Sequence, residues 1–185
     1  MTLPSRDTLV SYPSGALSGT GTTLHVDLRP DGRAVVVLDA TPCHPVDSGW
    51  PDQGPDRATL EWDGAVHPLL DCVIGATDGI HLYLGADIPV RKGTEGWVFV
   101  VAHIIDGTPP RLGQAVAVTV DADYRTAMSL GHTGCHIASL ALNRAVAERW
   151  TKEAMPDALG SPNFDALAID TSTILPNGSI DTFRL

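Results

Sequence analysis

The hydrophobic pattern of this chain changes its period at Asp121. Before this point, apolar residues occur in short runs that end in glycine, proline or aspartate, a pattern typical of β-strands joined by turns. After it, a long segment rich in Ala, Leu, Glu and Arg has the 3.6-residue period of a helix. The sequence therefore predicts an α+β protein. Residues 1–120 should form a β-barrel-like subdomain, and residues 121–185 a helix packed with a small antiparallel sheet.

Turn signals divide this pattern into individual elements. The Pro-Asp-Gly at 30–32 and the Pro-Asn-Gly at 176–178 each separate two strand-like runs and predict two hairpins. The helix is expected to begin after the capping residues Asp121 and Asp123 and to continue from about Tyr124 to Lys152. The predicted strands are 22–28, 34–38, 97–105, 115–120, 164–174 and 179–185.

Charge and composition limit the classes of partner. The sequence has 12 basic and 22 acidic residues, which gives a net charge of −10. No run of Lys or Arg provides a local basic patch that could bind a nucleic acid. The three cysteines, Cys43, Cys72 and Cys135, are widely spaced and predict reduced thiols. No signal-peptide pattern and no apolar run of about 20 residues is visible, so we expect a cytoplasmic protein without a membrane partner.

A pair of histidines is the strongest functional signal. Residues 132–136 read His-Thr-Gly-Cys-His, and histidines four apart on a helix project from one face, where both imidazoles can reach one metal ion. The polar stripe that contains them also holds Ser129, Ser139 and Asn143 and is almost uncharged near the histidines, which suits a cleft. We predict that His132 and His136 bind Zn²⁺ or another divalent transition metal. The alternative is a pair that is merely exposed or hydrogen-bonded to the backbone.

Two glycines flank this pair inside the predicted helix. Gly131 and Gly134 each cost about 1 kcal/mol of helix stability relative to alanine. Close packing of the helix against a neighbour explains such glycines, and so does space for a substrate against the backbone. Both explanations remain open.

A second candidate region is the long polar segment 41–52, rich in proline and glycine. Loops of this length in compact domains are usually functional or disordered. His44, Asp47 and Asp52 could serve there as ligands, bases or hydrogen-bond partners of a substrate amine, while a network of turns is the structural alternative. We expect this loop to approach the histidine stripe.

The order of these motifs resembles the editing domain of alanyl-tRNA synthetase and its freestanding relatives, the alanyl-tRNA editing proteins. The similarity runs from about Val35 to Asn143. Its elements are Val-Val-Leu-Asp at 36–39 before Thr-Pro at 41–42, Gly-Gln-Ala-Val at 113–116, Val-Asp at 120–121, Arg125, and His-Thr-x-x-His at 132–136. The resemblance implies a zinc-dependent hydrolase that cleaves the ester of mischarged aminoacyl-tRNA, with His132 and His136 as metal ligands.

The resemblance also assigns expected roles to other residues. Thr133 and Asp47 are the candidate catalytic residues, which would orient water or the substrate ammonium. The candidate substrate-binding residues are Thr41, His44, Asp52 and Arg125. Two functional alternatives accompany this assignment: a metal-dependent hydrolase of a small-molecule ester or amide, and a non-catalytic binding protein with a degenerate editing fold.

The sequence departs from the family pattern in two places. The family's Gly-Gly-Gly-Gln run is replaced by Asp-Ser-Gly-Trp at 47–50, and the family's Cys-x-x-x-His pair does not follow His136. Two imidazoles alone make a weak zinc site, because catalytic zinc normally has three protein ligands. A third ligand could come from His44, Asp47 or Cys135, from the second subunit of a homodimer, or from a segment outside this sequence.

Overall fold

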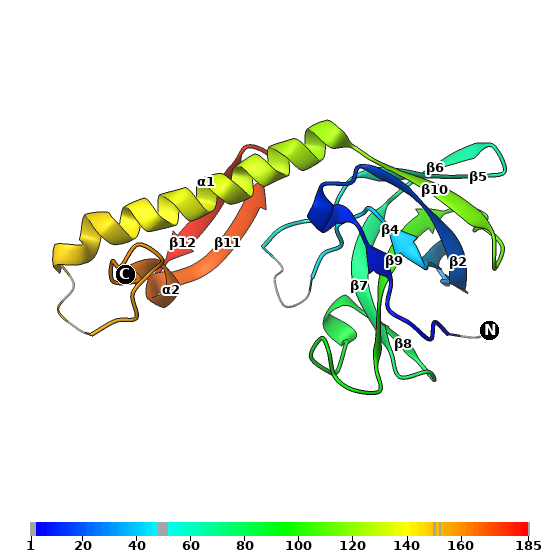
Figure 1. The fold of residues 1–185 in the computed structure, drawn as a ribbon, viewed down its shortest axis with the longest axis horizontal. Coiled ribbons are helices and arrows are strands. Elements are labelled where there is room, and N and C mark those ends of the chain that lie inside the picture. Colours follow the sequence, from blue (N-terminus) through cyan, green and yellow to red (C-terminus); the bar gives the residue numbers. More distant parts are fainter. Residues whose placement is uncertain (1–2, 48–51, 150, 152, 185) are drawn as a thin grey trace. The chain divides into compact units, whose positions relative to one another are not determined.

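The structure is a computed structural model, and it describes residues 3–47, 52–149, 151 and 153–184. The chain forms two compact units, Met1–Arg125 and Thr126–Leu185, which are described separately (Figure 1). The strands of the first unit are β1 (Leu9–Val10), β2 (Ser18–Leu28), β3 (Arg33–Leu38), β4 (Ala40–Thr41), β5 (Ala58–Trp62), β6 (Ala65–Pro68), β7 (Asp71–Thr77), β8 (Leu82–Leu84), β9 (Val98–Asp106) and β10 (Ala115–Val120). Short 3₁₀ turns occupy Tyr12–Ser14 and Gly85–Asp87. Helix α1 (Ala122–Val146) begins in the first unit and continues into the second, which adds a 3₁₀ turn at Ala147–Arg149, helix α2 (Phe164–Ala168) and strands β11 (Ile169–Leu175) and β12 (Gly178–Phe183).

One large antiparallel sheet forms the body of the first unit. Its eight strands have the order β6-β5-β10-β2-β3-β9-β7-β8, and β1 and β4 pair separately as a short parallel ribbon. The edge strands β6 and β8 do not pair with each other within the described residues, so the sheet is open and not a closed barrel. The predicted α+β class is confirmed.

Several predicted strands appear where the hydrophobic pattern placed them. The turn at 30–32 joins β2 to β3 in antiparallel register, with Gly32 at a φ of +87°, a conformation that glycine adopts without steric cost. Strand β10 has the predicted bounds, and its residues alternate between exposed and buried positions. This alternation places one face of β10 on the core and the other in solvent.

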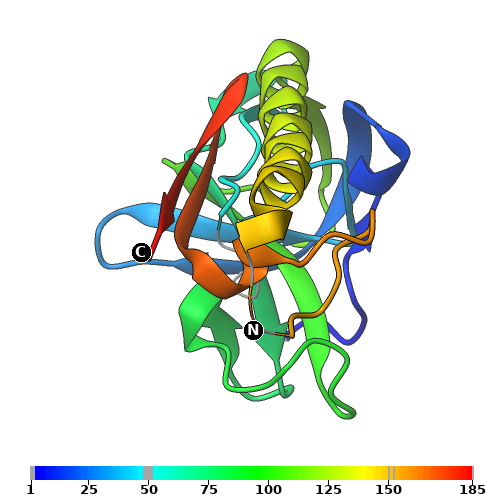
Figure 2. The same ribbon diagram turned by 90° about the vertical axis from the view of Figure 1, so that its left-hand side faces the viewer.

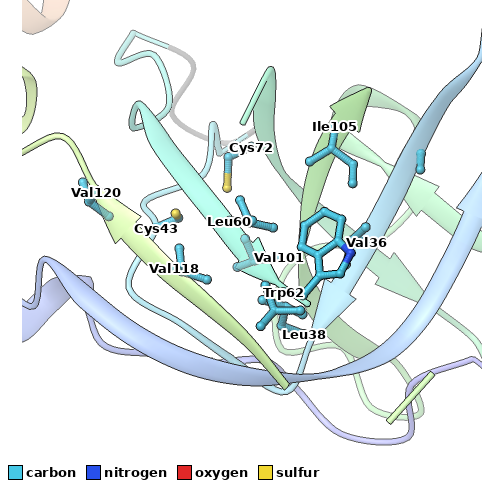
Figure 3. Close-up of a cluster of buried hydrophobic side chains, with 12 residues drawn as sticks. Val36, Leu38, Cys43, Leu60, Trp62, Cys72, Val101, Ile105, Val118 and Val120 are labelled. Carbon is cyan, nitrogen blue, oxygen red and sulfur yellow. The ribbon is translucent and has the colours of Figure 1, made fainter. Parts of the chain in front are cut away.

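The first unit has a main hydrophobic cluster on one face of β3 and a smaller cluster on the other. Strand β3 is buried on both faces: Val36 and Leu38 belong to the main cluster, whereas Val35 packs on the opposite side. Figure 3 shows part of the main cluster, in which Trp62 and two cysteines lie among aliphatic side chains. The central position of β3 in the sheet order explains its continuous apolar run.

In the second unit, α1 packs along the β11–β12 hairpin (Figures 1 and 2). The helix is capped as predicted, since Asp121 Oδ1 accepts the Tyr124 N–H at 2.9 Å. It ends at Val146 and continues as a 3₁₀ turn, earlier than the expected end at Lys152, which lies outside the described residues. Within the described part of the chain, no helix is both long and apolar enough to cross a membrane.

Gly131 and Gly134 differ in their surroundings. A Cβ built on Gly131 would lie 2.1 Å from the carbonyl oxygen of Leu175 and 2.5 Å from that of Gly178, far inside van der Waals contact. A Cβ on Gly134 would meet no heavy atom within 4 Å in the described structure. Close packing on the hairpin therefore explains Gly131, whereas Gly134 faces open space.

The segment 164–174 was expected to be one strand, and this prediction is wrong in its first half. Phe164–Ala168 forms α2, because the Asn163 side chain accepts the Ala166 N–H at 3.1 Å and so caps a helical turn. The remainder forms β11, which pairs with β12 across the predicted turn, where Asn177 has a φ of +62°.

A buried amide connects α1 to the segment that precedes this hairpin. Asn143 is 1% exposed. Its Nδ2 donates to Asp157 Oδ2 at 3.1 Å and to Asn163 Oδ1 at 3.3 Å, and its Oδ1 accepts the Asp165 N–H at 2.9 Å. The sequence placed Asn143 on the polar stripe with the histidines, but in the structure its polar atoms hold the loop against the helix.

Candidate functional site

The two histidines of α1 lie side by side. His132 is half-buried and His136 is exposed, and their Nε2 atoms are 2.9 Å apart. Zn–N bonds of about 2.05 Å at a tetrahedral angle would separate two such nitrogens by about 3.3 Å. A small opening of the pair would therefore suffice for both to bind one ion, so these residues fit the expected metal.

The neighbours of the pair on α1 point in different directions. Thr133 is exposed, whereas Cys135 turns toward the hairpin, with its Sγ 3.7 Å from both carboxylate oxygens of Asp181. Ser172 Oγ donates to the same carboxylate at 2.7 Å. No third His, Cys, Asp or Glu among the described residues of the second unit completes a compact ligand set with the two histidines. A third ligand, Cys135 included, stays a prediction.

The Thr41–Asp52 segment begins in the interior of the first unit. Thr41 is 2% exposed; its hydroxyl lies 2.9 Å from His103 Nε2 and accepts the Cys43 N–H at 3.2 Å. These contacts support a structural role for Thr41, and its role in substrate binding stays a prediction. Residues 48–51, which include most of the stretch that replaces the family's glycine-rich run, lie outside the described residues.

His44 and Asp47 both line a cavity of about 230 Å³ in the first unit. Tyr12 packs edge-on against the His44 ring with centroids 4.8 Å apart, and Lys92 lines the same cavity. Burial raises the pKa of Tyr12, and the charge of Asp47 raises it further. Asp52 is half-buried and is not among the described residues that line this cavity. Two of the three predicted loop residues thus share a pocket large enough for a small polar group.

Arg125 is held by protein atoms on several sides. Its Nε donates to Asp56 Oδ1 at 3.0 Å, and its Nη2 donates to Asp56 Oδ2. Nη1 donates to the Ala16 carbonyl and Nη2 to the Pro42 carbonyl, each at 2.8 Å. Four of the five guanidinium N–H groups therefore have partners within the first unit. This supports a structural role for Arg125, and its role in substrate binding stays a prediction.

Asp56 is a residue that the sequence analysis did not identify. It is 8% exposed and accepts the His44 N–H at 2.5 Å in addition to its ion pair with Arg125. Through these contacts the start of α1 is connected to the loop that carries His44. Its only signal in the sequence is an aspartate within a loop, which does not distinguish it from its neighbours.

A second cluster that the sequence did not reveal lies in the core of the first unit. Cys43, Cys72 and His103 each place one ligand atom within 4.8 Å of the others. Burial raises the pKa of the Cys72 thiol well above its ordinary value, whereas a hydrogen bond from that thiol lowers the pKa of Cys43 to about 5. His103 stands in the apolar run of β9, and a histidine in such a run is the one available sequence signal.

The predicted site residues therefore fall into two groups. Thr41, His44, Asp47, Asp52 and Arg125 lie in the first unit, and His132, Thr133 and His136 lie in the second. Contacts through Asp56 connect His44 to Arg125 in the first group, and the Nε2 atoms of the two histidines meet in the second. The expected approach of the loop to the histidine stripe stays a prediction.

Comparison with known proteins finds similarity to alanine–tRNA ligases. The enzyme of Frankia casuarinae is 31% identical over 139 residues, which cover 75% of this chain and 13% of the relative. The enzyme of Frankia alni is 30% identical over 165 residues (89% and 16%), and that of Caldivirga maquilingensis 27% over 123 residues (66% and 11%). No family model matches the chain. The chain is thus related to alanine–tRNA ligases over a small part of their length.

Proposed function

We propose that this protein hydrolyses the ester bond between an amino acid and tRNA, with a divalent metal ion held by His132 and His136. The observation that carries the proposal is the convergence of their Nε2 atoms, 2.9 Å apart, on one face of α1. Similarity to alanine–tRNA ligases over most of this chain supports a substrate related to aminoacyl-tRNA. Editing in particular, and the dependence on metal, are parts of the proposal.

The residues of the chain take separate tasks in this proposal. When bound, zinc supplies Lewis acidity that polarises a carbonyl and activates water. His132 and His136 would hold the ion, and we assign the orientation of the attacking water to Thr133, whose side chain is exposed. In the first unit, Asp47 and His44 line the 230 Å³ cavity, and their participation in substrate binding is a separate part of the proposal.

The net charge of −10 favours a second candidate, a hydrolase of small aminoacyl esters. Each phosphate contact of a nucleic acid requires a cation, and binding through several of them weakens steeply with salt. The sequence holds only two lysines, Lys92 and Lys152. A small ester needs no such basic surface, so the same metal chemistry suits it.

The deciding experiment offers the full chain seryl-tRNA, glycyl-tRNA and simple aminoacyl esters, with and without added Zn²⁺. We expect zinc-dependent deacylation of a charged tRNA and a rate that falls as salt rises. Replacement of both histidines, His132→Ala with His136→Ala, should lower the rate by about 10²-fold or more, because loss of the ion removes several kcal/mol of transition-state stabilisation.

His81→Ala is the matched control. His81 is an exposed histidine of the first unit whose side chain is 68% accessible and whose contact with Asp78 is 4.0 Å long. Its replacement should leave the rate unchanged. Hydrolysis of simple esters alone would transfer the assignment to the small-ester candidate. Equal activity of the double variant and the wild type would refute the role of the histidine pair in either reaction.

A further inference from the structure

The first unit brings two thiols and one imidazole together inside its core. Cys72 on β7 lies directly opposite His103 on β9 in the antiparallel register. The segment that follows Cys43 runs beside β7, since the Val46 N–H donates to the Cys72 carbonyl at 2.8 Å. Figure 3 shows the sulfur atoms of Cys43 and Cys72 facing each other. All three side chains are 0% exposed.

The ring of His103 is oriented as a metal-binding imidazole would be. Its Nδ1 lies 3.1 Å from the carbonyl oxygen of Val36, and because a carbonyl only accepts, Nδ1 carries the proton. The lone pair is therefore on Nε2, which accepts a hydrogen bond from the Thr41 hydroxyl at 2.9 Å. Metal-binding histidines typically donate their other ring N–H to a backbone carbonyl in this way.

Distances and charges also suit a zinc ion. Tetrahedral zinc with Zn–S bonds of about 2.3 Å and Zn–N bonds of about 2.05 Å separates two sulfurs by about 3.8 Å, and sulfur from nitrogen by about 3.6 Å. The ligand atoms here lie within 4.8 Å of one another, so no pair would need to close by more than about 1.2 Å. Two thiolates neutralise a dication, which removes most of the cost of burying its charge.

We propose that Cys43, Cys72 and His103 bind one Zn²⁺ ion in the core of the first unit. Binding exchanges whatever protons the two cysteines still carry for the ion; these protons leave to solvent, and nothing is oxidised or reduced. Thr41 Oγ1 would release the His103 lone pair by rotation about its Cα–Cβ bond. This site is separate from the histidine pair of α1 and does not depend on the proposed function.

The burial of the three ligands makes this site structural. Val101 and Val118 belong to the same buried cluster, so the site is enclosed by aliphatic side chains. Its ligands come from three segments that are separated by about 30 residues each, the loop after β4 and the strands β7 and β9. The ion would therefore tie these segments together and stabilise the folded state by its binding free energy.

The test uses Co²⁺ as a spectroscopic probe and Zn²⁺ for stoichiometry, with the full chain produced in the presence of each metal. We expect a thiolate-to-cobalt charge-transfer band in the near ultraviolet, and a zinc content that falls by one ion per chain in Cys43→Ser and in Cys72→Ser. Cys135→Ser is the matched control, because Cys135 is the third cysteine and lies in the second unit. It should keep the band in full.

Two further measurements distinguish loss of the metal site from misfolding of a variant. The double variant of His132 and His136 should keep the cobalt–thiolate band, which separates this site from the proposed catalytic one. Wild-type protein should melt at a higher temperature with zinc than after its removal. A folded wild type without the band, or a band that disappears in Cys135→Ser, would overturn the proposal. A mass two hydrogens lower under non-reducing conditions would also overturn it, since Cys43 and Cys72 would then be joined as a disulfide.

Discussion

Replacement of Gly131 by alanine should separate the hairpin from α1. The new Cβ would lie 2.1 Å from the Leu175 oxygen and 2.5 Å from the Gly178 oxygen. Optimal contact between such atoms is about 3.5 Å, so the hairpin backbone must withdraw by more than about 1 Å. Neither carbonyl can rotate away, because each belongs to the hairpin backbone. The hydrogen bond from the Asn177 N–H to the Ala127 carbonyl, 2.7 Å long, would be stretched by the same movement.

The change in the free energy of unfolding of Gly131→Ala is the sum of two opposed effects. Overpacking of this kind costs about 1–3 kcal/mol, and here the upper end applies because two backbone atoms resist. Alanine in place of a helical glycine stabilises the helix by about 1 kcal/mol. We therefore expect Gly131→Ala to lower the free energy of unfolding of the second unit by about 2 kcal/mol. Gly134→Ala meets no atom within 4 Å and should raise it by about 1 kcal/mol.

Urea unfolding of the two variants and wild type measures these changes, and hydrogen exchange of the β11 and β12 amides locates them. Exchange in the hairpin should accelerate in Gly131→Ala only, because the Gly134 side of the helix has no contact to lose. The packing argument is refuted if Gly131→Ala is as stable as wild type, or if both alanine variants shift the unfolding midpoint in the same direction.

Two other predictions concern hydrogen-bonded carboxylates. Asp56→Ala should lower the free energy of unfolding, measured by urea titration, by about 3–5 kcal/mol. The reason is that the Arg125 side chain is only 15% exposed and its charge would lose its partner. A loss below about 1 kcal/mol would contradict this reasoning. Desolvation alone would raise the pKa of Asp157, but hydrogen bonds from Asn143 and from backbone amides lower it below 3.8. The stabilisation from this carboxylate is therefore present above its ordinary pKa and is lost as the pH falls through the lowered one. An NMR titration should show the pKa of Asp157 returning toward 3.8 in Asn143→Ala, and an unchanged value would exclude the contact.

Local patterns in the sequence were sufficient for most of the elements. The turn at 30–32, the strand 115–120 and the cap at Asp121 were predicted correctly, because each depends on residues that are close in the chain. The segment 164–174 was not, since a short apolar run fits a helix and a strand equally well. In the structure, the Asn163 side chain caps a short helix, and β11 begins only after it.

The candidate sites divide in the same way. Histidines four residues apart on a helix must share a face, so the sequence alone placed His132 beside His136. It could not distinguish Gly131 from Gly134, because the difference lies in a hairpin more than 40 residues further along the chain.

The cluster of Cys43, Cys72 and His103 depends entirely on tertiary structure. Nothing in a spacing of about 30 residues indicates that three side chains will meet, and the same holds for the pair of Asp56 and Arg125. Hydrophobic periodicity reports which face of a strand is buried, but not which strand lies next to it. Strand order and register, which place Cys72 opposite His103, are decided by the packing of the whole sheet.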